Sequence, residues 1–144
     1  MITEIFLPMF YMLLLTLTVF LFSTFLRLKE IYLNKSLIDP EQHRHPPFTE
    51  GSRMLKNAQR NLANLFEFPI FFYVICIIIL ITNKVDEQFT ALAYWYLYLR
   101  IAHSIYHIFF NHLILNGGFP VRSLIWIPST IVLVCMWMIL ICSF

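Results

Sequence analysis

The sequence is poor in charge. Only 12% of its 144 residues are Asp, Glu, Lys or Arg, whereas 60% are hydrophobic. Soluble globular domains carry about a quarter charged residues, so this composition excludes an ordinary water-soluble domain. The length fits a single domain. The net charge of +2 is small, and no basic patch is interleaved with exposed aromatic residues, so no nucleic acid is expected as a partner.

The sequence also lacks the patterns of a metal or redox centre. Its three cysteines, Cys76, Cys135 and Cys142, all lie in apolar runs, and no two have the spacing of metal ligands or of a redox pair. They are expected to be small apolar residues within helices. His43 and His45 have no third ligand nearby, so we interpret them as part of a solvated loop and predict no metal site.

Long apolar runs are abundant. Ile5–Leu26 has about 22 residues without a charge, enough to cross a hydrocarbon layer of about 30 Å. No basic residue precedes this run and no small-residue cleavage site follows it, so we interpret it as a transmembrane helix rather than a signal peptide. The chain is predicted to be one integral membrane domain over residues 1–144, an all-α bundle of four transmembrane helices at about 4–29, 53–82, 88–112 and 121–143, with a loop at about 30–52.

Basic residues concentrate between the first two predicted helices. Seven of the ten Lys and Arg residues lie in segment 27–60. By the positive-inside rule this loop and the loop 111–122 face the cytoplasm, and both termini lie outside. The short loops and the absence of a recognisable retention signal favour a bacterial inner membrane.

Two predicted helices carry a polar stripe within an apolar surface. Arg60, Asn64 and Glu67 are spaced i, i+4 and i+7, which places them on one helical face. The next helix has a second stripe that consists of Arg100, His103, His107 and Asn111. If the two helices fold about their short turn so that residues whose numbers sum to 167 lie level, Glu67 meets Arg100, Asn64 meets His103 and Arg60 meets His107.

The depth of Glu67 and Arg100 calls for a partner. Each lies about 14 residues, roughly 20 Å, from the inner end of its helix. A charged residue at a helix centre costs about 2.5–3.5 kcal/mol, so we predict that the two form an ion pair sheltered from lipid. The pair either only fastens the helices or belongs to a site. Together with Arg60, His107 and Arg122, it indicates a pocket for a small anion whose cationic end meets Glu67.

The same residues resemble the pattern of the MAPEG superfamily, the membrane-associated proteins in eicosanoid and glutathione metabolism. Arg60-x-x-x-Asn64-x-x-Glu67, followed by Pro69, is similar to its second-helix signature. Arg100-x-x-His103-x-x-x-His107 and Arg122–Ser123 are similar to elements of its third and fourth helices. The pattern looks most like that of a bacterial branch, with His107 where a tyrosine is common.

The resemblance implies a left-handed four-helix bundle that assembles as a homotrimer. It implies that glutathione binds as co-substrate between neighbouring protomers near the cytoplasmic face, and that a lipophilic substrate enters from the bilayer. It assigns the catalytic role to Arg122, which would stabilise the glutathione thiolate. It assigns substrate binding to the other matching residues: Arg27, Arg60, Asn64, Glu67, Arg100, His103, His107 and Ser123.

Functions of three classes are compatible with these observations. The first is a glutathione-dependent transferase or peroxidase that acts on lipophilic electrophiles or lipid hydroperoxides. The alternative is a non-catalytic bundle, lipid-binding or scaffolding, in which the Glu67–Arg100 pair is structural. Proton or ion translocation along the stripe is disfavoured, because Phe89–Leu99 offers no polar continuation towards the outer side.

Overall fold

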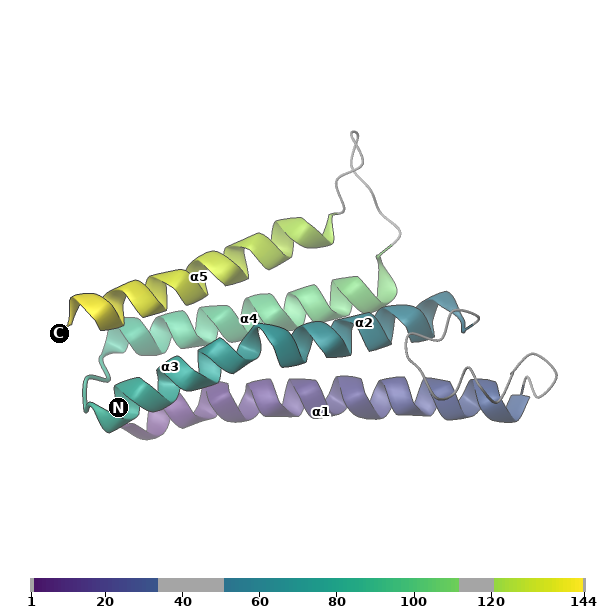
Figure 1. Cartoon of the computed structure of the whole chain (residues 1–144), viewed down its shortest axis with the longest axis horizontal. Coiled ribbons are helices and arrows are strands. Elements are labelled where there is room, and N and C mark those ends of the chain that lie inside the picture. Colours follow the sequence, from purple (N-terminus) through teal and green to yellow (C-terminus); the bar gives the residue numbers. More distant parts are fainter. Residues whose placement is uncertain (1, 34–50, 112–120, 144) are drawn as a thin grey trace.

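The computed structural model describes residues 2–33, 51–111 and 121–143, and the side chains of these segments from Glu4 onward. These residues form five helical segments: α1 Ile2–Leu33, α2 Arg53–Glu67, α3 Pro69–Ile81, α4 Glu87–Phe109 and α5 Arg122–Cys142. The helices run back and forth along one axis, with α2 and α3 end to end, so the chain forms four rods (Figure 1). The predicted all-α membrane bundle is confirmed.

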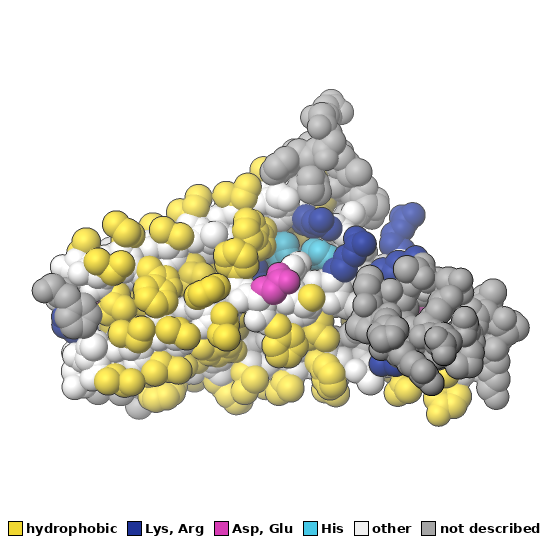
Figure 2. Space-filling view, in the orientation of Figure 1, with side chains coloured by type: hydrophobic (Ala, Val, Ile, Leu, Met, Phe, Trp, Pro, Cys, Tyr) yellow, Lys and Arg dark blue, Asp and Glu magenta, His cyan; other side chains and the backbone are white. Residues whose placement is uncertain are grey.

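Three of the rods have the length and apolarity of membrane-spanning segments: Glu4–Leu33, Arg53–Ile81 and Arg122–Cys142. Many large hydrophobic side chains are exposed on the outside of the bundle, and Figure 2 shows those on one face. The fourth rod, α4, has 23 residues but is less apolar, because its buried face includes Arg100, His103, Ser104 and His107. It packs against α1, α2 and α5 and is therefore the central helix of the bundle.

The helix expected over residues 53–82 is divided at Phe68. Pro69 is the first residue of α3; it has no N–H to continue the hydrogen-bond ladder of α2, and its ring crowds the preceding turn. Phe68 keeps helical dihedral angles (φ −75°, ψ −38°), so the rod bends rather than breaks (Figure 1). The bend separates a polar segment, α2, from an almost wholly apolar one, α3.

The turn between α3 and α4 is built by two capping motifs. Asn83 adopts the left-handed conformation (φ 55°), its N–H donates to the carbonyl of Leu80 at 3.2 Å, and the N–H of Lys84 donates to that of Ile79 at 3.1 Å. Asp86, three residues after Asn83, caps α4 by accepting a hydrogen bond from the N–H of Phe89 at 2.6 Å. Together these bonds fix the point about which the hairpin folds.

The register of the hairpin agrees with the sequence prediction. Phe72 of α3 stacks on Tyr96 of α4 with ring centroids 4.7 Å apart. Asn57 of α2 accepts a hydrogen bond from Asn111, just past the end of α4, at 3.0 Å. Both pairs have residue numbers that sum to 168, one away from the predicted 167. The polar stripes of the two helices therefore lie at a common depth.

The left-handed residue of the turn generates the first prediction. Replacing Asn83 by glycine leaves the turn unstrained, whereas Asn83→Val places a β-branched residue at positive φ, which costs about 1–2 kcal/mol. We expect the valine variant of the purified protein to unfold at a lower temperature in detergent than the glycine variant. Equal unfolding temperatures for the two would contradict the turn geometry.

Candidate functional site

A polar cavity of about 210 Å³ lies between α2, α4 and α5. It is lined by Asn64 of α2, His103 of α4, and Arg122, Ser123 and Trp126 of α5. Figure 2 shows histidine, basic and acidic side chains gathered in this part of the surface, beside the apolar remainder of the bundle. The helix pairing thus brings together four residues that the sequence had singled out and one, Trp126, that it had not.

Arg122 is held at this cavity by a chain of amide groups. Its Nη1 donates to Oδ1 of Asn111 at 3.0 Å. Nδ2 of Asn111 donates to Oδ1 of Asn57 at 3.0 Å, and Nδ2 of Asn57 donates to the carbonyl of Ile108 at 3.3 Å. The chain joins the first residue of α5 to α2 and to the end of α4, so the position of the guanidinium depends on all three helices.

Arg100 has a different partner from the one predicted. Its side chain is 1% exposed, and its Nη2 donates to the main-chain carbonyl of Asn64 at 2.7 Å. No ion pair joins it to Glu67 among the described residues, so the expected direct pair was wrong. Glu67 lies on the exposed side of α2, whereas Asn64, one turn earlier, faces α4.

Within the part of the chain that the structure describes, several buried polar atoms have no hydrogen-bond partner. They include Nε of Arg100, both ring nitrogens of His103, Nδ1 of His107, Oγ of Ser104 and both amide atoms of Asn61, which is fully buried. The rings of His103 and His107 lie 5.5 Å apart between centroids. Because buried polar groups in proteins are nearly always hydrogen-bonded, these atoms call for further partners, such as water or polar atoms of a ligand.

The remaining predicted residues lie at different distances from the cavity. His107 is buried on the same face of α4 as His103 and interacts electrostatically with Arg122 and Arg60. Arg60 and Glu67 are exposed on α2. Arg27 lies on α1, which contributes no residue to the cavity. His43 and His45 fall outside the described residues, and in the described part of the chain no cluster of three or more His, Cys, Asp or Glu could hold a metal ion.

Sequence reasoning missed two asparagines of α2 and the tryptophan of α5. Asn57, Asn61 and Asn64 are spaced i, i+4 and i+7, so the polar stripe, which begins at Arg60 in the prediction, could have been extended by about one turn towards the start of the helix. Trp126 lies one turn after Arg122 and packs edge-on against Phe68 with ring centroids 5.0 Å apart. An aromatic residue at a helix start gave no signal that it closes one side of a polar cavity.

Fold and site together define a helical membrane protein with a cationic, incompletely hydrogen-bonded pocket near one end of its bundle. The chain belongs to the MAPEG family, whose family model matches residues 5–142, nearly the whole chain. The predicted family is therefore confirmed, and with it a membrane protein of the superfamily concerned with glutathione and eicosanoid metabolism. No curated protein and no solved structure matched the chain.

The contacts of the polar stripes generate the second prediction. Glu67→Gln removes an exposed charge that has no ion pair in the described residues, so we expect a change in unfolding free energy within about 0.5 kcal/mol. Asn57→Ala leaves the carbonyl of Ile108 and an amide hydrogen of Asn111 unpaired, which costs about 1–3 kcal/mol. Chemical denaturation in detergent compares the two. A large loss of unfolding free energy in Glu67→Gln would indicate that an ion pair of Glu67 with Arg100 holds the two helices together after all.

Proposed function

We propose that the protein is a membrane-bound, glutathione-dependent transferase or peroxidase that acts on lipophilic electrophiles, including lipid hydroperoxides. The observation that carries the proposal is the environment of Arg122: a guanidinium beside a polar cavity, hydrogen-bonded to a neutral amide and next to Ser123 and His103. Membership of the MAPEG family supports it.

The residue types suit the chemistry of glutathione. Its two carboxylates match arginine side chains, and its ammonium matches the carboxylate of Glu67. A thiol with an ordinary pKa of about 8.5 is mostly protonated at neutral pH, and a neighbouring cation such as Arg122 raises the thiolate fraction. The thiolate sulfur then bonds to the electrophilic carbon while the leaving group departs with its electron pair. With a hydroperoxide, two glutathione molecules become the disulfide, and the products are the alcohol and water.

The size of the cavity supports a site shared between protomers. At about 210 Å³ it is smaller than the roughly 300–1,000 Å³ of usual ligand pockets, so it would hold only part of the tripeptide. Arg60 and Glu67 are exposed beside it on a rod that spans the membrane. Charged side chains facing lipid are costly. In our proposal a neighbouring protomer of a homotrimer covers them and completes the site.

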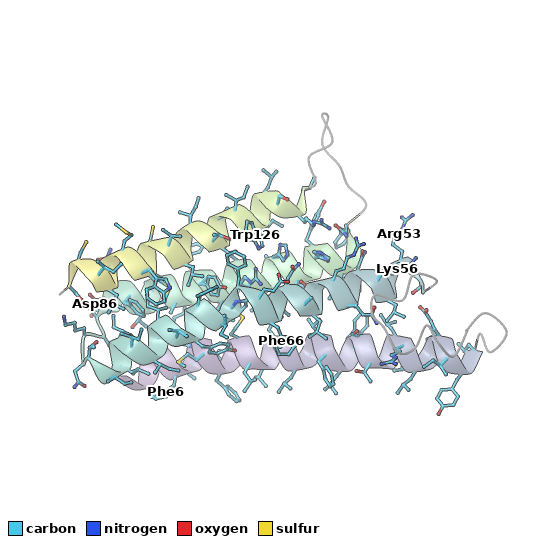
Figure 3. The ribbon with its side chains drawn as sticks, viewed as in Figure 1. Phe6, Arg53, Lys56, Phe66, Asp86 and Trp126 are labelled. Carbon is cyan, nitrogen blue, oxygen red and sulfur yellow. The ribbon has the colours of Figure 1, made fainter. Side chains whose placement is uncertain are left out.

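Basic residues support the proposed orientation. Arg53 and Lys56 lie at the end of the bundle opposite Asp86 (Figure 3). Arg27 and Lys29, on the last part of α1, add to the positive charge at that end. The positive-inside rule would place it on the cytoplasmic side of a bacterial inner membrane, with both termini outside.

Binding of glutathione tests the function directly. We expect the purified protein to bind glutathione at millimolar concentration or below, measured by calorimetry in detergent. Arg122→Ala and Arg60→Ala should each weaken binding by roughly tenfold or more, because each removes a charge-assisted hydrogen bond worth about 1.5–3 kcal/mol. Arg53→Ala, on the same helix as Arg60 but two turns further from Asn64 of the cavity, is the matched control and should bind as the wild type does. No binding by the wild type at millimolar glutathione would remove the proposal.

The oligomeric state tests the shared site. We expect native mass spectrometry of the protein released from detergent to show three copies, because exposed Arg60 and Glu67 need a protein neighbour. A protein that is monomeric both there and after chemical cross-linking in membranes would contradict it.

One observation favours the alternative of a lipid-binding, non-catalytic bundle. A groove of about 710 Å³ runs between α1 and the bend of α2 and α3, lined almost entirely by apolar residues that include Phe10, Phe66 and Ile70. It could take an acyl chain without any chemistry at Arg122. If that alternative holds, Arg122→Ala leaves lipid binding unchanged and glutathione does not bind.

A further inference from the structure

The amide chain that ends on Arg122 has a fixed direction. The carbonyl of Ile108 can only accept a hydrogen bond, so the amide of Asn57 must turn its Nδ2 towards it and its Oδ1 away. That oxygen accepts from Nδ2 of Asn111, which leaves Oδ1 of Asn111 for the guanidinium, a group that can only donate. Both ends of the chain therefore require the same orientation of both amides.

The helices hold this chain firmly at one end. Asn57 is 8% exposed within α2, and Asn111 lies immediately after Phe110, whose N–H ends α4 by donating to the carbonyl of Tyr106 at 2.8 Å. Arg122, by contrast, is half-buried and lines the cavity. This chain of hydrogen bonds thus makes the position of the Arg122 guanidinium at the cavity wall depend on that of the buried Asn57.

The chain also leaves the charge of Arg122 uncompensated. Its hydrogen-bond acceptor is the neutral amide oxygen of Asn111, and among the described residues no carboxylate forms an ion pair with it. Glu67, at the end of α2, is exposed and does not line the cavity. A carboxylate in place of Asn111 could still accept from the guanidinium, but it would neutralise its charge and could not donate to Oδ1 of Asn57.

We infer that Asn57 and Asn111 are positioning residues that fix the Arg122 guanidinium at the cavity while leaving its full positive charge available to a bound anion. The inference rests on the proposed function for the identity of that anion, the glutathione thiolate. Neither asparagine touches the cavity, so both act through the arginine.

The test is the isosteric change Asn111→Asp, with Asn83→Asp in the distant turn as the matched control. Ultraviolet absorbance of bound thiolate is titrated against pH, and S-methylglutathione, which cannot ionise, reports binding of the rest of the tripeptide. We expect Asn111→Asp to lower the bound thiolate fraction about tenfold at a pH below the thiol pKa, with S-methylglutathione affinity within about twofold. Asn57→Leu should lower the thiolate fraction in the same direction, because it releases the amide of Asn111.

A merely structural role predicts a different result. If both variants shift the unfolding temperature but leave the thiolate titration of the bound glutathione unchanged, the inference is overturned. The control Asn83→Asp should leave the titration as in the wild type, and an equal effect there would also overturn it.

A second measurement separates this inference from the proposed function. In a double-mutant cycle of Asn111→Leu and Arg122→Met, read by unfolding temperature without any ligand, a positioning contact makes the double variant lose less than the sum of the two single losses. Additive losses overturn the positioning role. If the cycle shows coupling but the wild-type protein binds no glutathione, the proposed function is overturned and the positioning of Arg122 still holds.

Discussion

The structure depends on one constraint: polar groups on the central helix must be satisfied inside a bundle whose other surfaces are apolar. Water is scarce at this depth, so each buried donor or acceptor needs a protein or ligand partner. Arg100 meets the constraint in part, through a main-chain carbonyl of α2, and Arg122 donates to Asn111, which Asn57 holds in turn. His103 and Asn61 do not meet it within the described residues, and the pocket lies where partners are missing.

The turn and the bend of the hairpin place these groups. Asn83 and Asp86 close the turn at a defined residue, so every pair across the hairpin has its level fixed. Pro69 then bends the rod just beyond Glu67, where the polar stripe ends and the apolar segment α3 begins. Local backbone chemistry at the turn and at the bend therefore determines which side chains of α2 face α4.

Much of this arrangement could be predicted from the sequence. Apolar runs and breaks indicate the rods, and the spacing of charged residues indicates which faces meet and at what depth. The partner of Arg100 could not be predicted, because a main-chain carbonyl leaves no trace in a residue pattern. Side-chain pairing rules favour the nearest opposite charge. Asn57 was predictable in principle from its spacing to Asn61 and Asn64, but an uncharged amide does not attract notice beside an arginine.

The division of labour among the charged groups follows from the same physics. A buried cation that is paired with a carboxylate has a structural role, because the carboxylate neutralises its charge. A cation that is hydrogen-bonded only to neutral oxygens keeps its positive electrostatic potential, which attracts an anion to an adjacent cavity. Arg122 donates to a neutral amide oxygen and lines a cavity, while Glu67 is exposed on α2 and can interact with a positively charged group. The ligand that we propose, glutathione, carries both signs of charge and would match such an arrangement.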